Sequence, residues 1–244
     1  MNVRAEKTVR EVAVEFPEAT RVFEKLGIDY CCGGNKSLQQ ACIALSLSVE
    51  EVIRSLDVAA QAARTKQPTG NWQEEALADL IEHIVASHHK YTREEVARLK
   101  PLLQKVCSVH GKKHPELEVV QDTFHELAQE LSTHMMKEEM VLFPYIVRME
   151  EAVIQKEPVL PAPFGSIENP VAIMVHEHDL AGVALRTIRQ SSTGFTPPPD
   201  ACVSYQTLYK ALADLEADLH QHIHLENNIL FPRALEMERN SRRI

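Results

Sequence analysis

One short segment occurs twice in this sequence, and it restricts the possible folds more than any other feature. Each copy has a carboxylate, a histidine and a glutamate spaced four residues apart, followed by an apolar pair and Phe-Pro: Glu130, His134 and Glu138 in the first, and Asp218, His222 and Glu226 in the second. Residues four apart lie on the same face of a helix. Each copy therefore predicts a helix that presents an imidazole beside a carboxylate.

The two glutamates fall where a helix buries its apolar face. On an ideal helix Glu138 lies within the apolar stripe of Leu131 and Leu142. Glu226 lies in the same way within a stripe that contains Leu219 and Leu230. A buried carboxylate without a partner is costly, and metal ligation compensates for that cost. We therefore expect both glutamates to bind a cation.

Two further helices add histidines to this inventory. His178 lies on the stripe of Met174 and Leu185, and the first long helix carries the neighbours His88 and His89, of which helical spacing alone places His88 nearer the centre of the apolar stripe. Four imidazoles and two carboxylates suit two first-row metal ions bridged by carboxylates. Because no thiolate belongs to the set, iron is favoured over structural zinc.

Acidic residues next to these histidines are predicted to orient them. Glu130 and Asp218 each precede a histidine of the repeat by one helical turn, and Glu177 adjoins His178. A carboxylate that accepts a hydrogen bond from the free N–H of a ligand histidine fixes its tautomer and ring orientation. We predict this supporting role for all three acids.

The remaining pattern predicts an all-α protein with two parts. Residues 1–65 form a small N-terminal domain of short helices, in which Thr8 begins a helix and Gly27 ends one; residues 66–72 have the composition of a linker. Residues 73–240 contain four long helical segments joined by short loops. Such segments predict an antiparallel four-helix bundle.

Composition excludes several classes of protein. The 244-residue chain carries a net charge of −9, which disfavours binding to nucleic acid or to anionic lipid. The sequence contains neither a transmembrane stretch nor a signal peptide, so we expect no membrane association and a cytoplasmic location. Five cysteines without regular spacing argue against a secreted disulfide scaffold. A homodimer is compatible with the sequence.

Several motifs together resemble a known family. They are Asp29-Tyr-Cys-Cys-Gly-Gly34, the segment Ser132 to Glu139, Glu177-His-Asp179, the Thr-Pro-Pro-Pro segment from Thr196, and the segment Leu225 to Ala234. Residues 75–238 resemble a hemerythrin-type bundle, and nearly the whole chain resembles the di-iron proteins that repair iron-sulfur clusters. The fold class expected is thus a hemerythrin-like antiparallel four-helix bundle preceded by a small helical domain.

The resemblance implies a centre of two non-haem irons with oxo and carboxylate bridges. Its ligands, carried over by position, are His89, His134, Glu138, His178, His222 and Glu226, with Glu138 and Glu226 as bridges. The resemblance, and not helical spacing, selects His89 over His88.

The implied function is repair of iron-sulfur clusters that nitric oxide or oxidants have damaged, by donation of iron to the damaged proteins. Two alternatives use the same ligands: a carrier or sensor of dioxygen or nitric oxide, and an enzyme that reduces nitric oxide. The neighbours Cys31 and Cys32 are expected to pass electrons or to help transfer iron, because thiolates are redox-active and bind metals.

Overall fold

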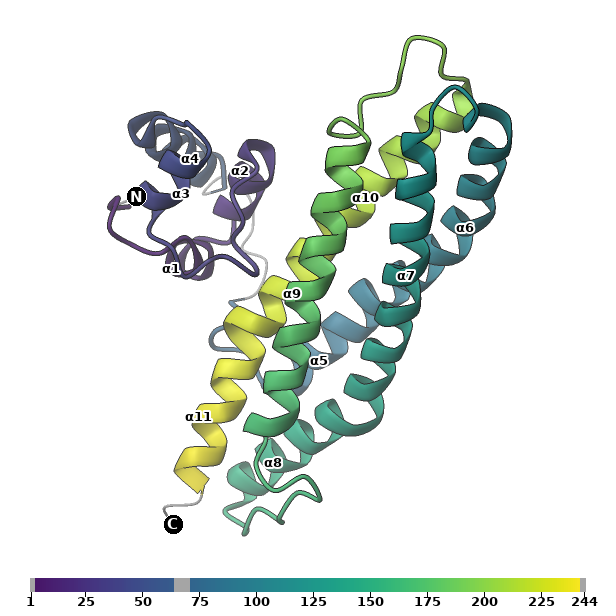
Figure 1. Ribbon diagram of the computed structural model, residues 1–244. Coiled ribbons are helices and arrows are strands. Elements are labelled where there is room, and N and C mark those ends of the chain that lie inside the picture. The colour runs from purple at the N-terminus through teal and green to yellow at the C-terminus, as the bar shows by residue number, and fades with distance from the viewer. Residues whose placement is uncertain (1–2, 64–70, 242–244) are drawn as a thin grey trace. The chain divides into compact units, whose positions relative to one another are not determined.

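The structure is a computed structural model that describes residues 3–63 and 71–241. In these residues the secondary structure is helical apart from turns and two isolated bridges, Thr8–Ser37 and Ala162–Gly165, which confirms the predicted all-α class. The chain forms two compact units (Figure 1): residues 1–80 with 220–233, and residues 81–219 with 234–244. Most of the linker predicted at 66–72 lies outside the described residues.

Four short helices make up most of the first unit: α1 (Val9–Glu15), α2 (Ala19–Leu26), α3 (Leu38–Ala44) and α4 (Val49–Ala63). Thr8 caps α1 by accepting from the N–H of Glu11, and Gly27 ends α2 with a φ of 70°, as the sequence predicts. Buried side chains from all four helices, among them Val12, Phe23, Leu38 and Leu56, form the core of this unit.

The segment 220–233 belongs to the first unit because Tyr30 and its neighbours contact it. The Tyr30 hydroxyl accepts a hydrogen bond from Nε2 of Gln221 at 2.8 Å, and the Tyr30 carbonyl accepts one from Nδ2 of Asn228 at 2.9 Å. The Tyr30 ring also packs edge-on against the ring of His224, with 5.4 Å between centroids. The turn after α2 is therefore attached to a segment that lies almost two hundred positions away.

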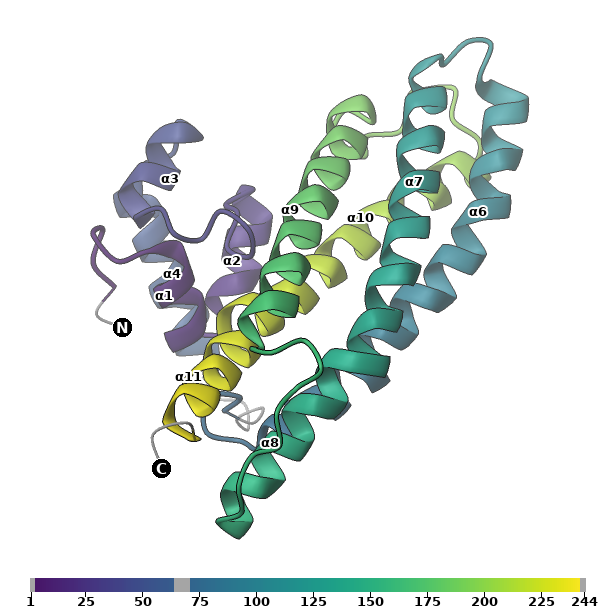
Figure 2. The ribbon, with the colours of Figure 1, turned by 60° about the horizontal axis from the view of Figure 1, so that its bottom comes forward.

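Longer helices follow in chain order. They are α5 (Leu77–His83), η1 (Ile84–His89), α6 (Lys90–His110), α7 (Glu116–Lys137), η2 (Glu138–Leu142), α8 (Phe143–Gln155), α9 (Glu168–Ser191), α10 (Val203–Leu225), η3 (Glu226–Leu230) and α11 (Phe231–Ser241). Within the second unit α6, α7, α9 and residues 203–219 of α10 bury one continuous apolar core. Figures 1 and 2 show that these four helices alternate in direction, which is the predicted antiparallel bundle.

The three η segments are π-helical turns, which regular helical periodicity does not reveal. In two of them the N–H of a phenylalanine reaches back five residues: Phe143 donates to the carbonyl of Glu138, and Phe231 to that of Glu226. A proline follows each phenylalanine and has no N–H for the regular α-helical bond. The Phe-Pro pairs of the repeat thus provide a reason for the π turns, which concentrate at functional sites in proteins.

None of the helices in the part of the chain that the structure describes is both long enough and apolar enough to cross a membrane.

Candidate metal centre

His89 ends η1 and is completely buried. Its Nδ1 lies 2.6 Å from Oε1 of Glu139, which also accepts a hydrogen bond of 2.6 Å from Nη2 of Arg93. Burial raises the pKa of Glu139, but the hydrogen bonds from His89 and Arg93 outweigh it and hold that pKa below its usual value. An ionised Glu139 accepts the Nδ1 proton, which leaves the Nε2 lone pair of His89 available to a cation.

His134, near the end of α7, has an equivalent arrangement. Its Nδ1 lies 2.8 Å from Oε2 of Glu177 on α9, and the other oxygen of Glu177 forms an ion pair with Lys137. Burial raises the pKa of Glu177, and the hydrogen bonds from Lys137 and His134 lower it by more. The acid bonded to His134 Nδ1 here is thus Glu177, whereas Glu130, which we predicted to support this histidine, is exposed on α7.

The buried glutamate of η2 lies between these two histidines. Oε2 of Glu138, a residue with 0% exposure, is 3.4 Å from Nε2 of His89 and 3.4 Å from Nε2 of His134. His178 on α9 brings its own Nε2 to 2.9 Å from that of His134. Three imidazole nitrogens and one carboxylate thus converge from η1, η2, α7 and α9.

The second copy of the repeat has the same local geometry. Nε2 of His222 lies 2.9 Å from Oε1 of Glu226, and both side chains are buried. Glu226 begins η3 as Glu138 begins η2. The internal similarity of the sequence therefore corresponds to a repeated structure: an α-helical histidine followed by a glutamate at the start of a π turn.

The buried ligands fall into two overlapping groups, each able to hold a metal ion. Within each group the candidate ligand atoms all lie within 4.8 Å of one another, and the groups are His89, Glu138, His222, Glu226 and His134, Glu138, His178, Glu226. Each group has two histidines, and both contain the same two glutamates. Imidazole nitrogen with carboxylate oxygen is a donor set that suits iron.

The neighbouring histidines on the first long helix have different surroundings. His89 is the one grouped with buried glutamates, whereas Nδ1 of His88 lies 3.0 Å from Oδ1 of Asp218. Asp218, the acid that we predict to support His222, thus contacts His88. Helical spacing favours His88 as the inward-facing candidate ligand, because it is calculated for a regular α-helix. The π turn η1 contains an extra residue, which brings His89 to the buried face.

Three residues that support the site do not follow from the sequence pattern: Glu139, Arg93 and Lys137. Glu139 contacts a histidine fifty positions earlier in the chain, so no helical spacing reveals the pair. The one sequence signal for Glu139 is its position directly after the candidate ligand Glu138. Lys137 lies one helical turn after His134, but its partner Glu177 is on another helix, so spacing does not predict the ion pair.

Cys31 and Cys32 form a third group with Asp29 in the first unit. The two sulfur atoms are 3.6 Å apart, and Oδ1 of Asp29 lies 3.5 Å from Sγ of Cys31. Burial and the neighbouring Cys32 and Asp29 hold the pKa of the Cys31 thiol well above its usual value; the hydrogen bond with Cys32 is the largest cause. The sequence predicted the pair of cysteines but not the participation of Asp29.

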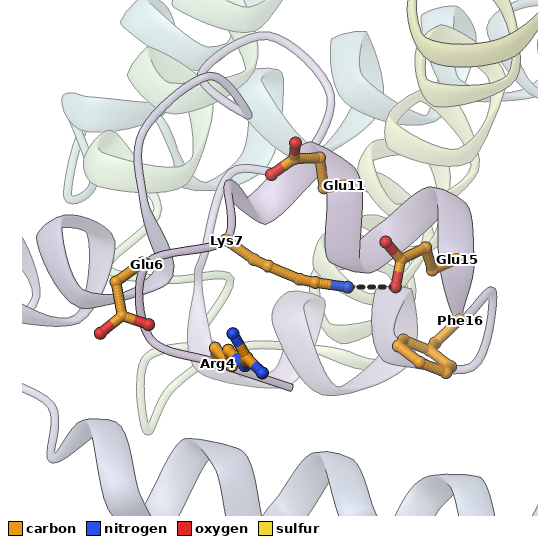
Figure 3. Close-up of a pocket in the computed structure, with 6 residues that line it drawn as sticks. All are labelled: Arg4, Glu6, Lys7, Glu11, Glu15 and Phe16. Atoms are coloured by element: carbon orange, nitrogen blue, oxygen red, sulfur yellow. Dashed lines mark hydrogen bonds and ion pairs between the residues drawn. The ribbon is translucent and has the colours of Figure 1, made fainter. Parts of the chain in front are cut away.

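Two surface pockets differ in their relation to these groups. One, of about 450 Å³, is lined by residues of α7 and α9, including the candidate ligands His134 and His178 and the acids Glu126, Glu130 and Glu177. The other, beside α1, is lined by Arg4, Glu6, Lys7, Glu11, Glu15 and Phe16, and Figure 3 shows Lys7 paired with Glu15 across it. Only the first pocket reaches histidines of a candidate metal group.

Comparison with known proteins agrees with this geometry. Residues 80–234 match the family described as "Hemerythrin HHE cation binding domain", and residues 5–60 match a domain of unknown function, DUF542. The chain is 35% identical over 234 residues to "Iron-sulfur cluster repair protein YtfE" of Pectobacterium atrosepticum, covering 96% of this chain and 98% of that protein. It is 36% identical over 228 residues to the protein of the same name from Citrobacter koseri, covering 93% and 96%.

Proposed function

Because this chain belongs to the iron-sulfur cluster repair proteins with a hemerythrin-type cation-binding domain, we propose that it repairs damaged clusters by donating iron from a dinuclear centre. The proposed ligands are His89, His134, Glu138, His178, His222 and Glu226. The proposed recipients are iron-sulfur proteins damaged by nitrosative or oxidative stress.

The position of Glu138 carries the proposal of two metal ions. One of its oxygens is equally distant, at 3.4 Å, from imidazole nitrogens on two different helices. Glu226 is the other residue common to both candidate groups. Two ions that shared Glu138 and Glu226 as bridging carboxylates would each receive two histidines. In this arrangement the metal ions would also balance the negative charge of two completely buried carboxylates.

Bound iron would supply the metal that a damaged cluster has lost. The protein's own groups hold and orient it: Glu139 and Glu177 keep the Nδ1 protons of His89 and His134, so that both Nε2 atoms stay directed at Glu138. These acids are ionised and paired with Arg93 and Lys137. Such outer contacts adjust how tightly a metal is held.

The pocket at His134 and His178 is the proposed route by which iron leaves. Its lining includes three glutamates, Glu126, Glu130 and Glu177, and one lysine, Lys137. Carboxylates along a cavity favour a cation in transit. Glu130, exposed and outside the proposed ligand set, would act here as an intermediate acceptor of iron.

The proposed function is tested by repair of an iron-sulfur enzyme whose cluster has been damaged. The iron-loaded protein should restore the activity of that enzyme. A His134→Leu variant should bind less iron and restore less of the enzyme's activity. Metal analysis and Mössbauer spectroscopy should find about two irons per chain as a coupled pair. Equal repair by the variant, or sustained conversion of nitric oxide to nitrous oxide without iron loss, would contradict iron donation.

Replacement of Glu130 separates delivery of iron from its binding. Glu130→Gln should keep its iron but release it more slowly, roughly tenfold, to a chelator added in excess. The matched control is Glu118→Gln, which removes an exposed carboxylate from the same helix outside the pocket lining. Equal release rates in the two variants would show that iron does not leave past Glu130.

A further inference from the structure

The turn from Asp29 to Gly34 holds three potential ligand atoms close together. Oδ1 of Asp29 accepts hydrogen bonds from the N–H groups of Cys31 and Cys32, at 3.2 and 2.9 Å, and this fixes the carboxylate beside the two sulfur atoms. The turn is tight: a Cβ on Gly33 would lie 3.0 Å from Oδ2 of Asp29, and one on Gly34 would lie 2.8 Å from the carbonyl oxygen of Tyr30. A side chain at position 34 would clash with the backbone, and one at position 33 would displace the Asp29 carboxylate.

The distances within the turn fit one cation with tetrahedral geometry. Metal–sulfur bonds of about 2.3 Å and metal–oxygen bonds of about 2.1 Å place ligand atoms about 3.8 Å (S···S) and 3.6 Å (S···O) apart at the tetrahedral angle. The observed distances are 3.6 Å between the sulfur atoms and 3.5 Å between Sγ of Cys31 and Oδ1 of Asp29. A linear two-coordinate ion would need the sulfur atoms roughly 4.6 Å apart at the same bond length.

The electrostatics of the turn also favour a cation. Although burial raises the pKa of Asp29, the hydrogen bonds from Gly33, Cys32 and Cys31 outweigh it and lower that pKa, so the carboxylate is ionised at neutral pH. The same negative charge opposes ionisation of Cys31. A divalent ion would remove this opposition and stabilise both thiolates.

We infer that Asp29, Cys31 and Cys32 bind one divalent cation of borderline softness, such as Zn²⁺ or Fe²⁺. The site is separate from the histidine and glutamate groups and needs none of their residues. Two thiolates and one carboxylate leave the fourth tetrahedral position for an outside ligand, and solvent reaches the site through the half-buried Cys32. Binding by two thiols releases two protons to the solvent.

The turn is joined to the helical segment that carries Glu226. The carbonyl oxygen of Cys31 accepts a hydrogen bond of 3.4 Å from Asn227, and that of Tyr30 accepts one of 2.9 Å from Asn228. Both asparagines directly follow Glu226 in η3. A cation in the turn would therefore lie on a rigid support and not on a loose loop.

Cobalt is the probe that distinguishes this site from the bundle. Full-length, iron-loaded, reduced protein is titrated with Co²⁺ without oxygen, and a thiolate-to-cobalt charge-transfer band in the near ultraviolet should saturate at one equivalent. Histidine and carboxylate ligands produce no such band, so cobalt in the bundle would not imitate it. Zn²⁺ added afterwards should abolish the band, and a weakly buffered solution should register the release of protons.

Three variants and one control decide the assignment. Cys31→Ser and Cys32→Ser should each lose the band. Asp29→Asn, which keeps an oxygen to accept the same N–H groups, should weaken cobalt binding at least about tenfold. Cys202→Ser, which removes an exposed cysteine elsewhere, should behave like the unmodified protein. Circular dichroism verifies folding of each variant.

No band in the unmodified protein, or a band that survives in both Cys31→Ser and Cys32→Ser, would overturn the inference. An unchanged affinity in Asp29→Asn would remove the carboxylate from the site and thus overturn the three-ligand assignment. Because the assay detects thiolate ligation and not repair activity, its failure would leave the proposed iron donation unaffected.

Discussion

At the scale of single residues, the acids that accept hydrogen bonds from histidine Nδ1 atoms determine how the candidate ligands are oriented. Glu139 accepts from His89 and also from Arg93, while Glu177 accepts from His134 and pairs with Lys137. Each imidazole is thereby held with its other nitrogen toward Glu138. Orientation of this kind is established before any metal arrives, which reduces the entropy lost on binding.

Glu139→Gln should weaken iron binding by about 10- to 100-fold, because an amide cannot replace the charge that holds His89. The measurement is competition with a chelator of known affinity, followed at equilibrium. Glu94→Gln, an exposed position on the same helix as Arg93, is the control. If both variants bound iron equally well, the contact between Glu139 and His89 would have no role in metal affinity.

His224 makes the stability of the first unit depend on pH. Burial, with a smaller effect of Arg10, lowers its pKa to about 4, and its Nδ1 accepts a hydrogen bond from Asn228. The unfolded chain binds this proton more tightly, since its histidine has a pKa of about 6.5. The stabilising contribution is therefore present above pH 6.5 and is lost as the pH falls toward 4.

Between pH 7 and pH 5 the metal-free protein should lose roughly 2 kcal/mol more of its free energy of unfolding than a His224→Gln variant. Urea unfolding of each protein at pH 7 and at pH 5 measures how much free energy of unfolding it loses. Comparison of the variant with the unmodified chain cancels the other titrating groups. An equal loss in the two proteins would mean that folding does not lower the pKa of His224.

At the scale of elements, the π turns decide which residues face inward. Most of the architecture follows from the sequence: helical periodicity and cap residues predict the all-α class, the bundle, the start of α1 and the end of α2. The choice between His88 and His89 did not follow, because hydrophobic periodicity assumes 3.6 residues per turn. Only a local departure from that period, in η1, buries His89.

Contacts between distant segments were the other part that spacing could not predict. The pairs His134–Glu177 and His88–Asp218 join residues from different helices, and intrahelical spacing instead favoured Glu130 and Asp218 as partners within each repeat. Rules for residues four apart describe one helix at a time. The side chains that orient a ligand can come from any helix packed against it.

Pro144→Ala tests whether proline maintains the π turn at Glu138. With an N–H restored at position 144, the helix can form the regular bond to Met140, and Glu138 would rotate away from the histidines. Iron content should fall well below that of the unmodified protein while helix content is kept. Pro101→Ala, which removes a proline from inside α6, should leave iron content unchanged. Full iron content in Pro144→Ala would show that packing alone maintains the turn.

At the scale of the whole molecule, the candidate ligands come from segments spread over 138 positions of the chain, from His89 to Glu226. A metal ion that joins such distant segments stabilises the folded chain by binding it and not the unfolded one. Stability and metal content are therefore expected to change together.

Removal of iron by a chelator should lower the melting temperature, and restoring it should reverse the change. At a free metal concentration one hundred times Kd the stabilisation is about 2.7 kcal/mol, which corresponds to a rise in melting temperature of roughly 5–11 °C for a chain of this size. Scanning calorimetry of both forms measures it. His178→Ala should reduce the difference, and an identical melting temperature with and without iron would contradict metal binding by the folded core.

The contacts of Tyr30 affect how this protein can be divided for experiments. A fragment that begins after residue 72 would retain every proposed iron ligand, yet it would lack the partner of Gln221, His224 and Asn228. In the sequence Gln221 precedes His222, His224 lies between His222 and Glu226, and Asn228 follows Glu226. Removal of the first domain would therefore expose the helical segment 220–233, which carries two of the proposed ligands. Poor iron content in such a shortened protein would not show whether the ligands themselves are correctly assigned.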